Sequence, residues 1–214
     1  MRKILIIAGI LLCCLNMQAQ DMKSLFVALP DSLSPLLTEV NRADFGDFLA
    51  SNMKAQVKNR FGNTSEMLKL TDDYLLLKVS AVSTAEMKLL PLNDSVKVIC
   101  VVQTYQGPVS DSRVSFYDTS WKSLPAENFL TLPAEDAFYK TPVTETQTDS
   151  LKNLRTRADM FLLKAVLSEK DTSLSFRLLL LPDYLDKETL KEIKPYLVAE
   201  PLKYVWQNGR FARL

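Results

Sequence analysis

Ser51 and Lys54 have the S-x-x-K spacing of serine–lysine acyl enzymes, in which the serine is the nucleophile and the lysine is its base. This chemistry requires a desolvated lysine beside the serine. Both residues fall away from the apolar stripe of the helix expected around them, so we expect both to be solvated. The K-T-G string of such enzymes has no counterpart, since Lys140-Thr141 is followed by Pro142. A Ser-Lys hydrolase therefore remains only as an alternative.

Carboxylate pairs at Asp72-Asp73 and Glu135-Asp136 are the other catalytic candidates. Adjacent residues seldom converge on one substrate, and the first pair suits a turn. The sequence contains no histidine, which removes Ser-His and Cys-His catalysis and His-ligated metals. It also lacks a calcium loop, a nucleophile elbow, a phosphate-binding glycine loop and metal-spaced cysteines. We therefore predict a protein that is not an enzyme, with no catalytic residue, no metal and no cofactor.

A small charged group stands at the start of the predicted long helix. It consists of Arg42, Asp44 and Asp47. The two carboxylates suit the positive end of a helix, and Arg42 can pair with a carboxylate. The group has two interpretations, a helix-start stabiliser and a charged recognition site.

Residues 118–150 differ from the rest of the chain because they carry three prolines and many threonines and acids. Leu124–Glu127 and Leu132–Glu135 repeat the string L-P-A-E, and an aromatic residue follows each copy. We predict an irregular crossover with a helical turn at each proline; the alternative is a recognition loop. The candidate interaction surface comprises Trp121, Phe129, Phe138 and Tyr139.

The elements that would position these residues are organised around one strand, Val96–Tyr105. Its two side-chain parities are both apolar, and a strand that is apolar on both faces is covered on both. We therefore place it in the middle of a sheet, within a run of strands from Thr64 to Trp121. The fold class predicted is α+β, with a mostly antiparallel sheet.

A helix of about 20 residues, Arg42–Phe61, is predicted to pack its Phe-rich stripe on one face of this sheet, with Asn41 as N-cap and Gly62 as terminator. A strand pair, 160–167 and 174–181, follows the crossover. A second, short helix is expected near the C-terminus at 186–194. Asn208-Gly209 predicts a type I′ hairpin. The length of residues 20–214 fits a single α+β domain.

The N-terminus has the organisation of a secretory signal peptide over residues 1–19. A basic start, Met1-Arg2-Lys3, precedes an apolar run from Ile4 to Leu15, with Ala19 at the expected cut. The alternatives are a retained anchor and lipidation at Cys13 or Cys14. Cleavage would reduce 26 basic residues to 24 against 25 acidic residues, which gives no attraction to nucleic acid. We expect an exported, periplasmic or envelope-associated chain without a transmembrane span after cleavage, whose one cysteine, Cys100, is a buried hydrophobe.

Several strings resemble a family of exported Bacteroides-type proteins of unknown function. They are Arg42-x-Asp44-x-x-Asp47, Asn59-x-Phe61-Gly62, Leu70-Thr71-x-x-Tyr74-Leu75, Thr84-x-Glu86-Met87-Lys88-Leu89-Leu90-Pro91, Asp111-Ser112-x-Val114-x-Phe116-Tyr117 with Trp121, and Tyr204-x-Trp206 with Gly209-Arg210-Phe211. The resemblance implies export and an α+β fold. It implies no activity and no catalytic residue.

Taken together, these features favour a non-catalytic binding or protein-interaction module of the cell envelope. Its partner would be an unknown protein or small ligand there. The alternatives are a structural subunit of an envelope assembly, and a carboxylate- or Ser-Lys-dependent hydrolase.

Overall fold

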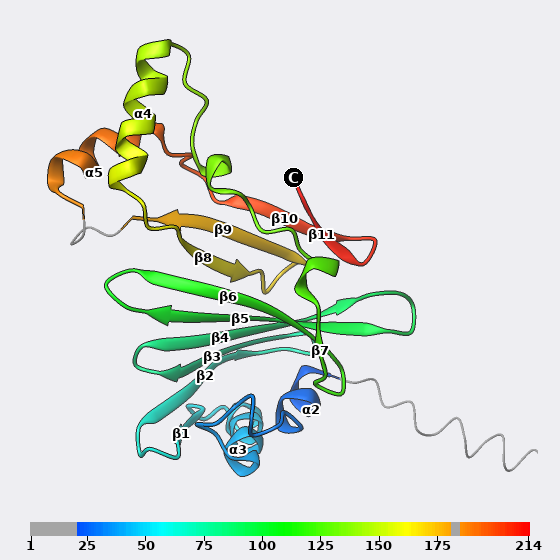
Figure 1. Cartoon of the computed structure of the whole chain (residues 1–214). Helices are drawn as coiled ribbons and strands as arrows, with labels where there is room; N and C mark the ends of the chain where they lie inside the picture. Colours follow the sequence, from blue (N-terminus) through cyan, green and yellow to red (C-terminus); the bar gives the residue numbers. More distant parts are fainter. Residues whose placement is uncertain (1–20, 181–184) are drawn as a thin grey trace, which may run out of the picture.

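The structure, a computed structural model, describes residues 21–180 and 185–214, so the expected signal peptide at 1–19 lies outside the described residues. A seven-stranded antiparallel sheet, the large sheet, forms the middle of the molecule (Figure 1). Its strands are neighbours in the order in which they occur in the chain. They are β1 (Gln56–Lys58), β2 (Thr64–Leu70), β3 (Tyr74–Ser80), β4 (Ser83–Pro91), β5 (Lys97–Gln106), β6 (Ser110–Asp118) and β7 (Ser123–Leu124).

A four-stranded antiparallel sheet, the small sheet, packs over one face of the large sheet (Figure 1). Its order is β11-β10-β9-β8, from β8 (Leu162–Leu167), β9 (Ser173–Leu179), β10 (Leu202–Gln207) and β11 (Arg210–Arg213). Helices α2 (Met22–Val27) and α3 (Glu39–Ala50) cover the opposite face of the large sheet. The mostly antiparallel α+β class is thus confirmed.

The central position of β5 is also confirmed, since β4 and β6 pair with it on either side. Val98, Cys100 and Val102 face the small sheet and belong to the core between the two sheets. Ile99 and Val101 face the helices and belong to a second core with α2 and α3. A strand buried on both faces needs apolar residues at both parities, which is why the pattern located β5 correctly.

The long helix predicted over Arg42–Phe61 is wrong in its bounds. Helix α3 begins after Thr38, whose side chain and that of Asn41 form a reciprocal capping box, and it ends at Ala50. The chain then turns and enters the large sheet as edge strand β1. Val57 lies at a helical spacing from the earlier apolar residues, but it is buried by strand alternation instead. Phe61 is 75% exposed in the β1–β2 turn, so the apolar stripe does not extend that far.

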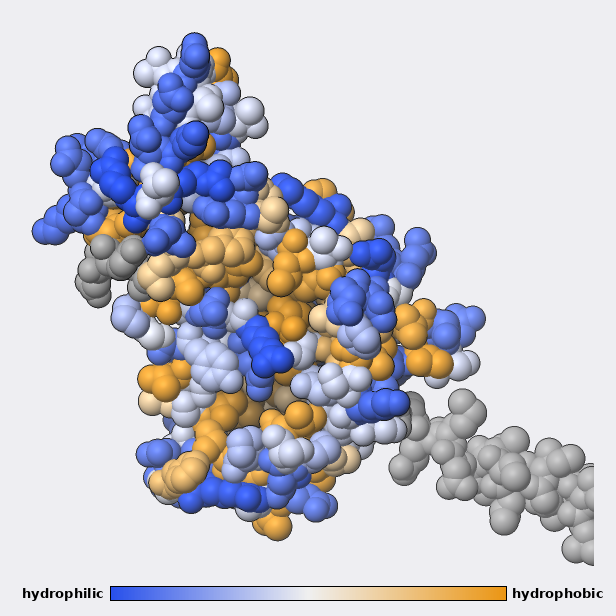
Figure 2. Space-filling model, in the orientation of Figure 1, coloured by the Kyte–Doolittle hydropathy of each residue, from blue (hydrophilic) through white to orange (hydrophobic). Residues whose placement is uncertain are grey.

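The crossover over residues 118–150 has the predicted helical turns at two of its prolines. A 3-10 helix, Ala126–Asn128, follows Pro125, and another, Glu135–Phe138, follows Pro133. Its last part was not predicted to be regular, yet it begins α4 (Glu145–Arg157). This helix projects from the body of the molecule in Figure 1 and is mostly hydrophilic in Figure 2.

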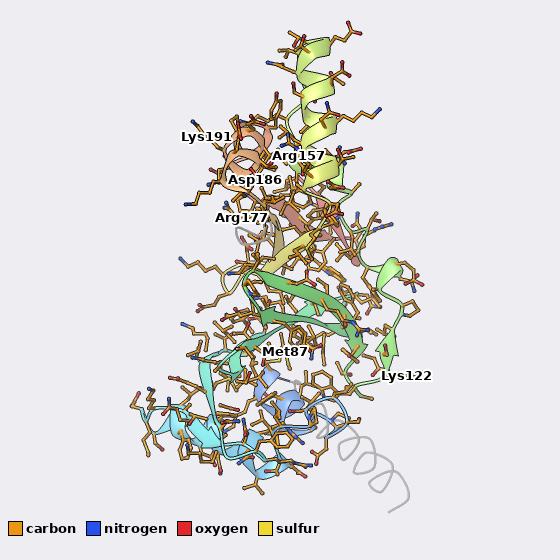
Figure 3. All side chains as sticks on the ribbon, turned by 60° about the vertical axis from the view of Figure 1, so that its left-hand side comes forward. Met87, Lys122, Arg157, Arg177, Asp186 and Lys191 are labelled. Atoms are coloured by element: carbon orange, nitrogen blue, oxygen red, sulfur yellow. The ribbon has the colours of Figure 1, made fainter. Side chains whose placement is uncertain are left out.

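The C-terminal elements agree with expectation. Helix α5 (Lys187–Ile193) begins after Asp186, whose carboxylate accepts the N–H of Thr189 at 2.8 Å. Asn208 and Gly209 have positive φ angles of 50° and 77° in the β10–β11 turn, as a type I′ turn requires. Arg157 of α4 lies close to Asp186 at the start of α5 in Figure 3 and donates to the Thr189 hydroxyl at 2.9 Å. Among the described residues, no helix has the length and apolar character needed to cross a membrane.

Candidate functional site

A groove of about 450 Å³ opens between the large sheet and the segment that joins α2 to α3. We call this segment, residues 28–38, the strap. Helix α2 lies beneath the right-hand end of the large sheet in Figure 1, whereas the β3–β4 and β5–β6 turns lie at its left-hand end. The groove lies on the helix-facing side of the large sheet, over the part that is nearer these turns. Its volume falls within the range of small-molecule sites in proteins.

The floor of the groove is a row of register partners across four strands. Leu77 pairs with Ala85, Ala85 with Gln103, and Gln103 with Arg113. All four residues line the groove. Because side chains alternate across a strand, residues two positions away belong to the same face. Met87, Val101 and Ser115 form the adjacent row; they also line the groove, and Met87 is labelled in Figure 3.

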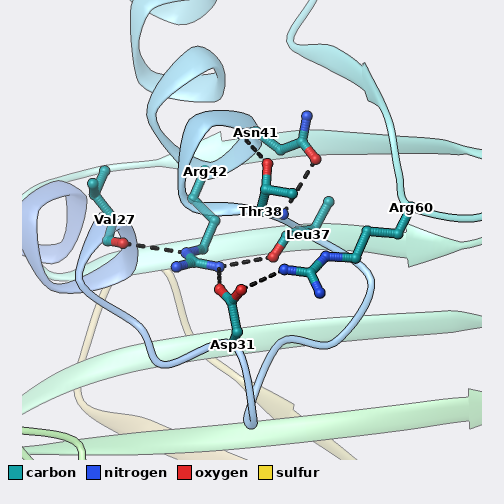
Figure 4. A network of polar contacts seen from close by, with 7 residues as sticks. All are labelled: Val27, Asp31, Leu37, Thr38, Asn41, Arg42 and Arg60. Atoms are coloured by element: carbon teal, nitrogen blue, oxygen red, sulfur yellow. Dashed lines mark hydrogen bonds and ion pairs between the residues drawn. The ribbon is translucent and has the colours of Figure 1, made fainter.

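The opposite wall is the strap, which an ionic cluster holds in place (Figure 4). Asp31 of the strap accepts from the guanidinium of Arg42 at 3.0 Å and also from that of Arg60. Arg42 additionally donates to the carbonyl oxygens of Val27 at 3.2 Å and Leu37 at 2.8 Å. The hydrogen bond from Arg42 is the main reason why the pKa of Asp31 lies below its ordinary value. The strap is therefore tied to both α3 and the β1–β2 turn.

Trp121 closes the groove at its inner end and is 6% exposed. Its indole Nε1 donates to the carbonyl oxygen of Leu25 at 2.9 Å, and its ring lies 5.7 Å from that of Tyr117. Its φ of 63° allows the chain to turn back from β6 towards β7. Trp121 is thus the candidate aromatic residue that the structure does place at this site.

Of the described residues that line the groove, one is charged, Arg113. Its side chain is exposed, and it makes no ion pair or hydrogen bond with a described residue. The other polar lining groups are neutral hydroxyls and one amide, including Ser83, Ser115 and Gln103. The described part of the site therefore combines a floor that is apolar at Leu77, Ala85, Met87 and Val101 with one positive charge that has no ion-pair partner.

The other three aromatic candidates are buried in the core that the two sheets share with α4, not on an exposed surface. Phe129 stacks on Phe116 with ring centroids 5.0 Å apart, and Phe138 meets Phe161 edge-on at 6.0 Å. Tyr139 lies beneath the guanidinium of Arg155 at 4.8 Å. Burial is the main cause that raises the pKa of Tyr139 to about 12. The two L-P-A-E copies thus direct their aromatic rings inwards, where they cover apolar strands.

The charged group predicted at Arg42, Asp44 and Asp47 does not come together. Arg42 is buried and bonds to the strap, whereas Asp47 is exposed and pairs with Lys23 at 3.2 Å. Asp44 makes no hydrogen bond or ion pair with a described residue. Arg42 therefore serves the groove indirectly, by holding its wall.

The residues on which the hydrolase alternative depends are not assembled into a catalytic site. Ser51 is exposed just after α3, and the side chain of Lys54 is 68% exposed and 3.6 Å from the Glu66 carboxylate. Each acidic pair has at least one carboxylate that contacts a cation. Asp73 contacts Lys88 at 2.9 Å.

Glu135 and Asp136 both contact Arg155, at 3.2 and 2.6 Å. These three residues line one of two open hollows, of about 690 and 550 Å³, beside α4. In the larger hollow Arg155 is already paired with both carboxylates. In the smaller one Glu192 pairs with Arg157 at 3.6 Å, and Lys140 donates to the carbonyl oxygen of Pro195 at 2.7 Å. No cluster of three potential metal-ligating side chains occurs within residues 21–180 and 185–214.

Sequence reasoning missed the groove because its residues come from four strands and the strap. The signal available in the sequence was the change in polarity along one face of β5 and β6, that is, at every second residue. The helix-facing side chains are apolar at Ile99 and Val101 and then become polar at Gln103. Their partners on β6 become polar one pair earlier, at Ser115 opposite Val101, and then at Arg113 opposite Gln103.

Comparison with known proteins agrees with the fold and assigns no activity. A domain of an uncharacterised protein from Porphyromonas gingivalis W83 has a similar structure, with a TM-score of 0.79 and 31% sequence identity, over 92% of this chain and 100% of that one. No curated protein matches the chain. The family described as "Protein of unknown function (DUF3256)" matches residues 14–211, and the chain therefore belongs to this family.

Proposed function

We propose that the chain is an exported, envelope-associated binding module without catalytic activity, and that the groove between the strap and the large sheet is its ligand site. The observation that carries this proposal is the groove itself. Its floor is built from paired positions on β3 to β6 and its wall from the strap. A site on regular strands with an anchored wall is pre-organised, so a ligand loses little binding energy in ordering it.

Carbon-13 labelling of the methionine methyl groups tests the site directly. Met87 lines the groove, whereas Met160 lies outside it and serves as the internal control. Titration with 1-octanol, used as an apolar probe, is expected to shift the Met87 signal and leave that of Met160 unchanged.

A variant that fills the groove gives the second half of the test. Gln103→Trp places a large ring on the floor and is expected to abolish the Met87 response. Gln106→Trp is the matched control, because Gln106 is on the same strand and does not line the groove. A Met87 response that persists in Gln103→Trp would refute the assignment of the site.

Export requires a separate measurement on the full chain in cells. We expect the recovered protein to begin at Gln20, after cleavage behind Ala19. N-terminal mass spectrometry of fractionated cells checks this. A chain that keeps Met1 and stays in the cytoplasm would refute the export proposal, and a lipid-modified Cys13 or Cys14 would refute simple cleavage.

A further inference from the structure

We propose that the groove binds a small amphipathic anion, with its acidic group at Arg113 and its apolar part along the floor towards Trp121. This inference rests on the binding function proposed above and specifies the chemical class of the ligand. It joins two independent features of the groove, its charge and its apolar depth.

The first feature is that no described residue neutralises the positive charge of Arg113. Among the lining residues within 21–180 and 185–214, Arg113 is the one that carries a charge, and none is a carboxylate. It has no ion-pair partner among the described residues. The guanidinium is therefore free to meet a ligand carboxylate in the bidentate geometry that arginine favours.

The second feature is the apolar surface that begins one strand beyond this charge. The buried apolar lining residues are Phe26, Leu29, Leu77, Ala85, Met87, Val101 and Trp121. Arg113 is separated from Ala85 by Gln103 alone in the floor row. A ligand whose acid group reaches Arg113 therefore has its apolar part over this surface, where burial contributes about 25 cal/mol per Å².

The described lining of the groove offers no negative group that could bind a ligand cation. A ligand cation in the groove would face Arg113 without a compensating carboxylate, and like charges in a partly enclosed site repel. A neutral apolar molecule would bind the floor and leave the Arg113 charge unused. The groove thus discriminates between head groups that share one apolar chain.

Three probes with the same eight-carbon chain test this discrimination on the protein from Gln20 to Leu214. They are octanoate, 1-octanol and octylammonium, titrated below their aggregation limits with the Met87 methyl signal as readout. The expected order of affinity is octanoate, then 1-octanol, then octylammonium. Because the Arg113 side chain is exposed and screened, we expect octanoate to bind about five-fold more tightly than 1-octanol.

Two variants assign the preference to Arg113. Arg113→Gln is expected to remove the difference between octanoate and 1-octanol, whereas Arg113→Lys retains part of it. Lys78→Gln removes the same charge from an exposed position on β3 outside the groove, and it should leave the preference intact. Because Arg113 makes no bond with a described residue, its replacement is not expected to impair folding.

The outcomes separate this inference from the proposed function. If octanoate and 1-octanol shift Met87 with equal affinity, the groove binds apolar molecules and the anion inference is overturned. An equal loss of preference in Lys78→Gln overturns it too, because the effect is then one of net charge. If none of the probes shifts Met87, both the inference and the proposed function fail.

Discussion

Glu86 of β4 is buried between the two sheets and should make the stability of the fold depend on pH. Its side chain is 7% exposed. One carboxylate oxygen accepts the backbone N–H of Leu167 at 2.8 Å, on the free edge of β8, and the hydroxyl of Tyr74 at 3.4 Å. Glu86 therefore links the large sheet to the small one.

Burial is the largest cause that raises the pKa of Glu86, to about 7 from an ordinary value of 4.5. The two hydrogen bonds and the charge of Lys164 act in the opposite direction but do not offset it. Between these two pH values the folded chain binds more protons than the unfolded chain. Stability is therefore highest below about pH 4.5, as far as this group is concerned, and is lost as pH rises through 7.

The magnitude follows from the pKa difference between the two states. Each pKa unit corresponds to about 1.4 kcal/mol, so Glu86 should lower the free energy of unfolding by about 3 kcal/mol between pH 4.5 and 8. Glu86→Gln removes the charge and keeps an oxygen that can accept from Leu167. The variant should therefore gain about 3 kcal/mol relative to the wild type over this pH range.

Urea unfolding of both proteins at several pH values measures this difference. Contributions from all other titrating groups cancel in the comparison, and Glu200→Gln, at an exposed position, serves as the matched control. If the stability curves of wild type and Glu86→Gln run parallel, Glu86 titrates normally in the folded chain. That result would refute the reasoning, because the cost of burying the charge would then be fully compensated.

Two further predictions concern Arg42 and Cys100. Arg42→Ala removes the side-chain donor to the carbonyl oxygens of Val27 and Leu37 and leaves Asp31 with Arg60 alone, so it should lower the free energy of unfolding by about 2 kcal/mol. Lys23→Ala, at an exposed ion pair, should change it by less than about 0.5 kcal/mol. Urea unfolding measures both, and equal effects of the two variants would contradict a structural role for Arg42. Burial is also the main cause that raises the pKa of the Cys100 thiol, so in a chain beginning at Gln20 it should react with a disulfide reagent only after unfolding. Rapid reaction of the native chain would show that β5 is accessible.

The sequence was most informative where one residue pattern permits one structure. Apolar residues at both parities of β5 require cover on both sides, and the structure provides the small sheet on one and the helices on the other. Asn208-Gly209 supplies the two positive φ angles of its hairpin. Pro125 and Pro133 each precede a short helical turn.

The sequence misled where two periodicities coincide. Val57 fits the helical spacing that begins at Phe45, and it also fits a strand in which Ala55 and Val57 are buried. The structure resolves this in favour of β1, because residues 56–58 gain hydrogen-bonded partners on β2.

Helix α4 was not predicted, for a different reason. The buried residues of this helix are Leu151 and Leu154, and two residues give only a weak apolar pattern.

The groove depends on register, which a single sequence does not display. Gln103 and Arg113 are ten residues apart in the chain and become neighbours only because β5 and β6 pair around the 106–110 turn. A face packed by the protein itself would continue with large apolar residues at these positions, as it does at Ile99 and Val101. At Gln103 and Arg113 the face is polar because it reaches solvent, while the strap still forms the opposite wall of the groove. The proposed ligand site is therefore the boundary between this polar end and the apolar lining, where an amphipathic molecule can use both.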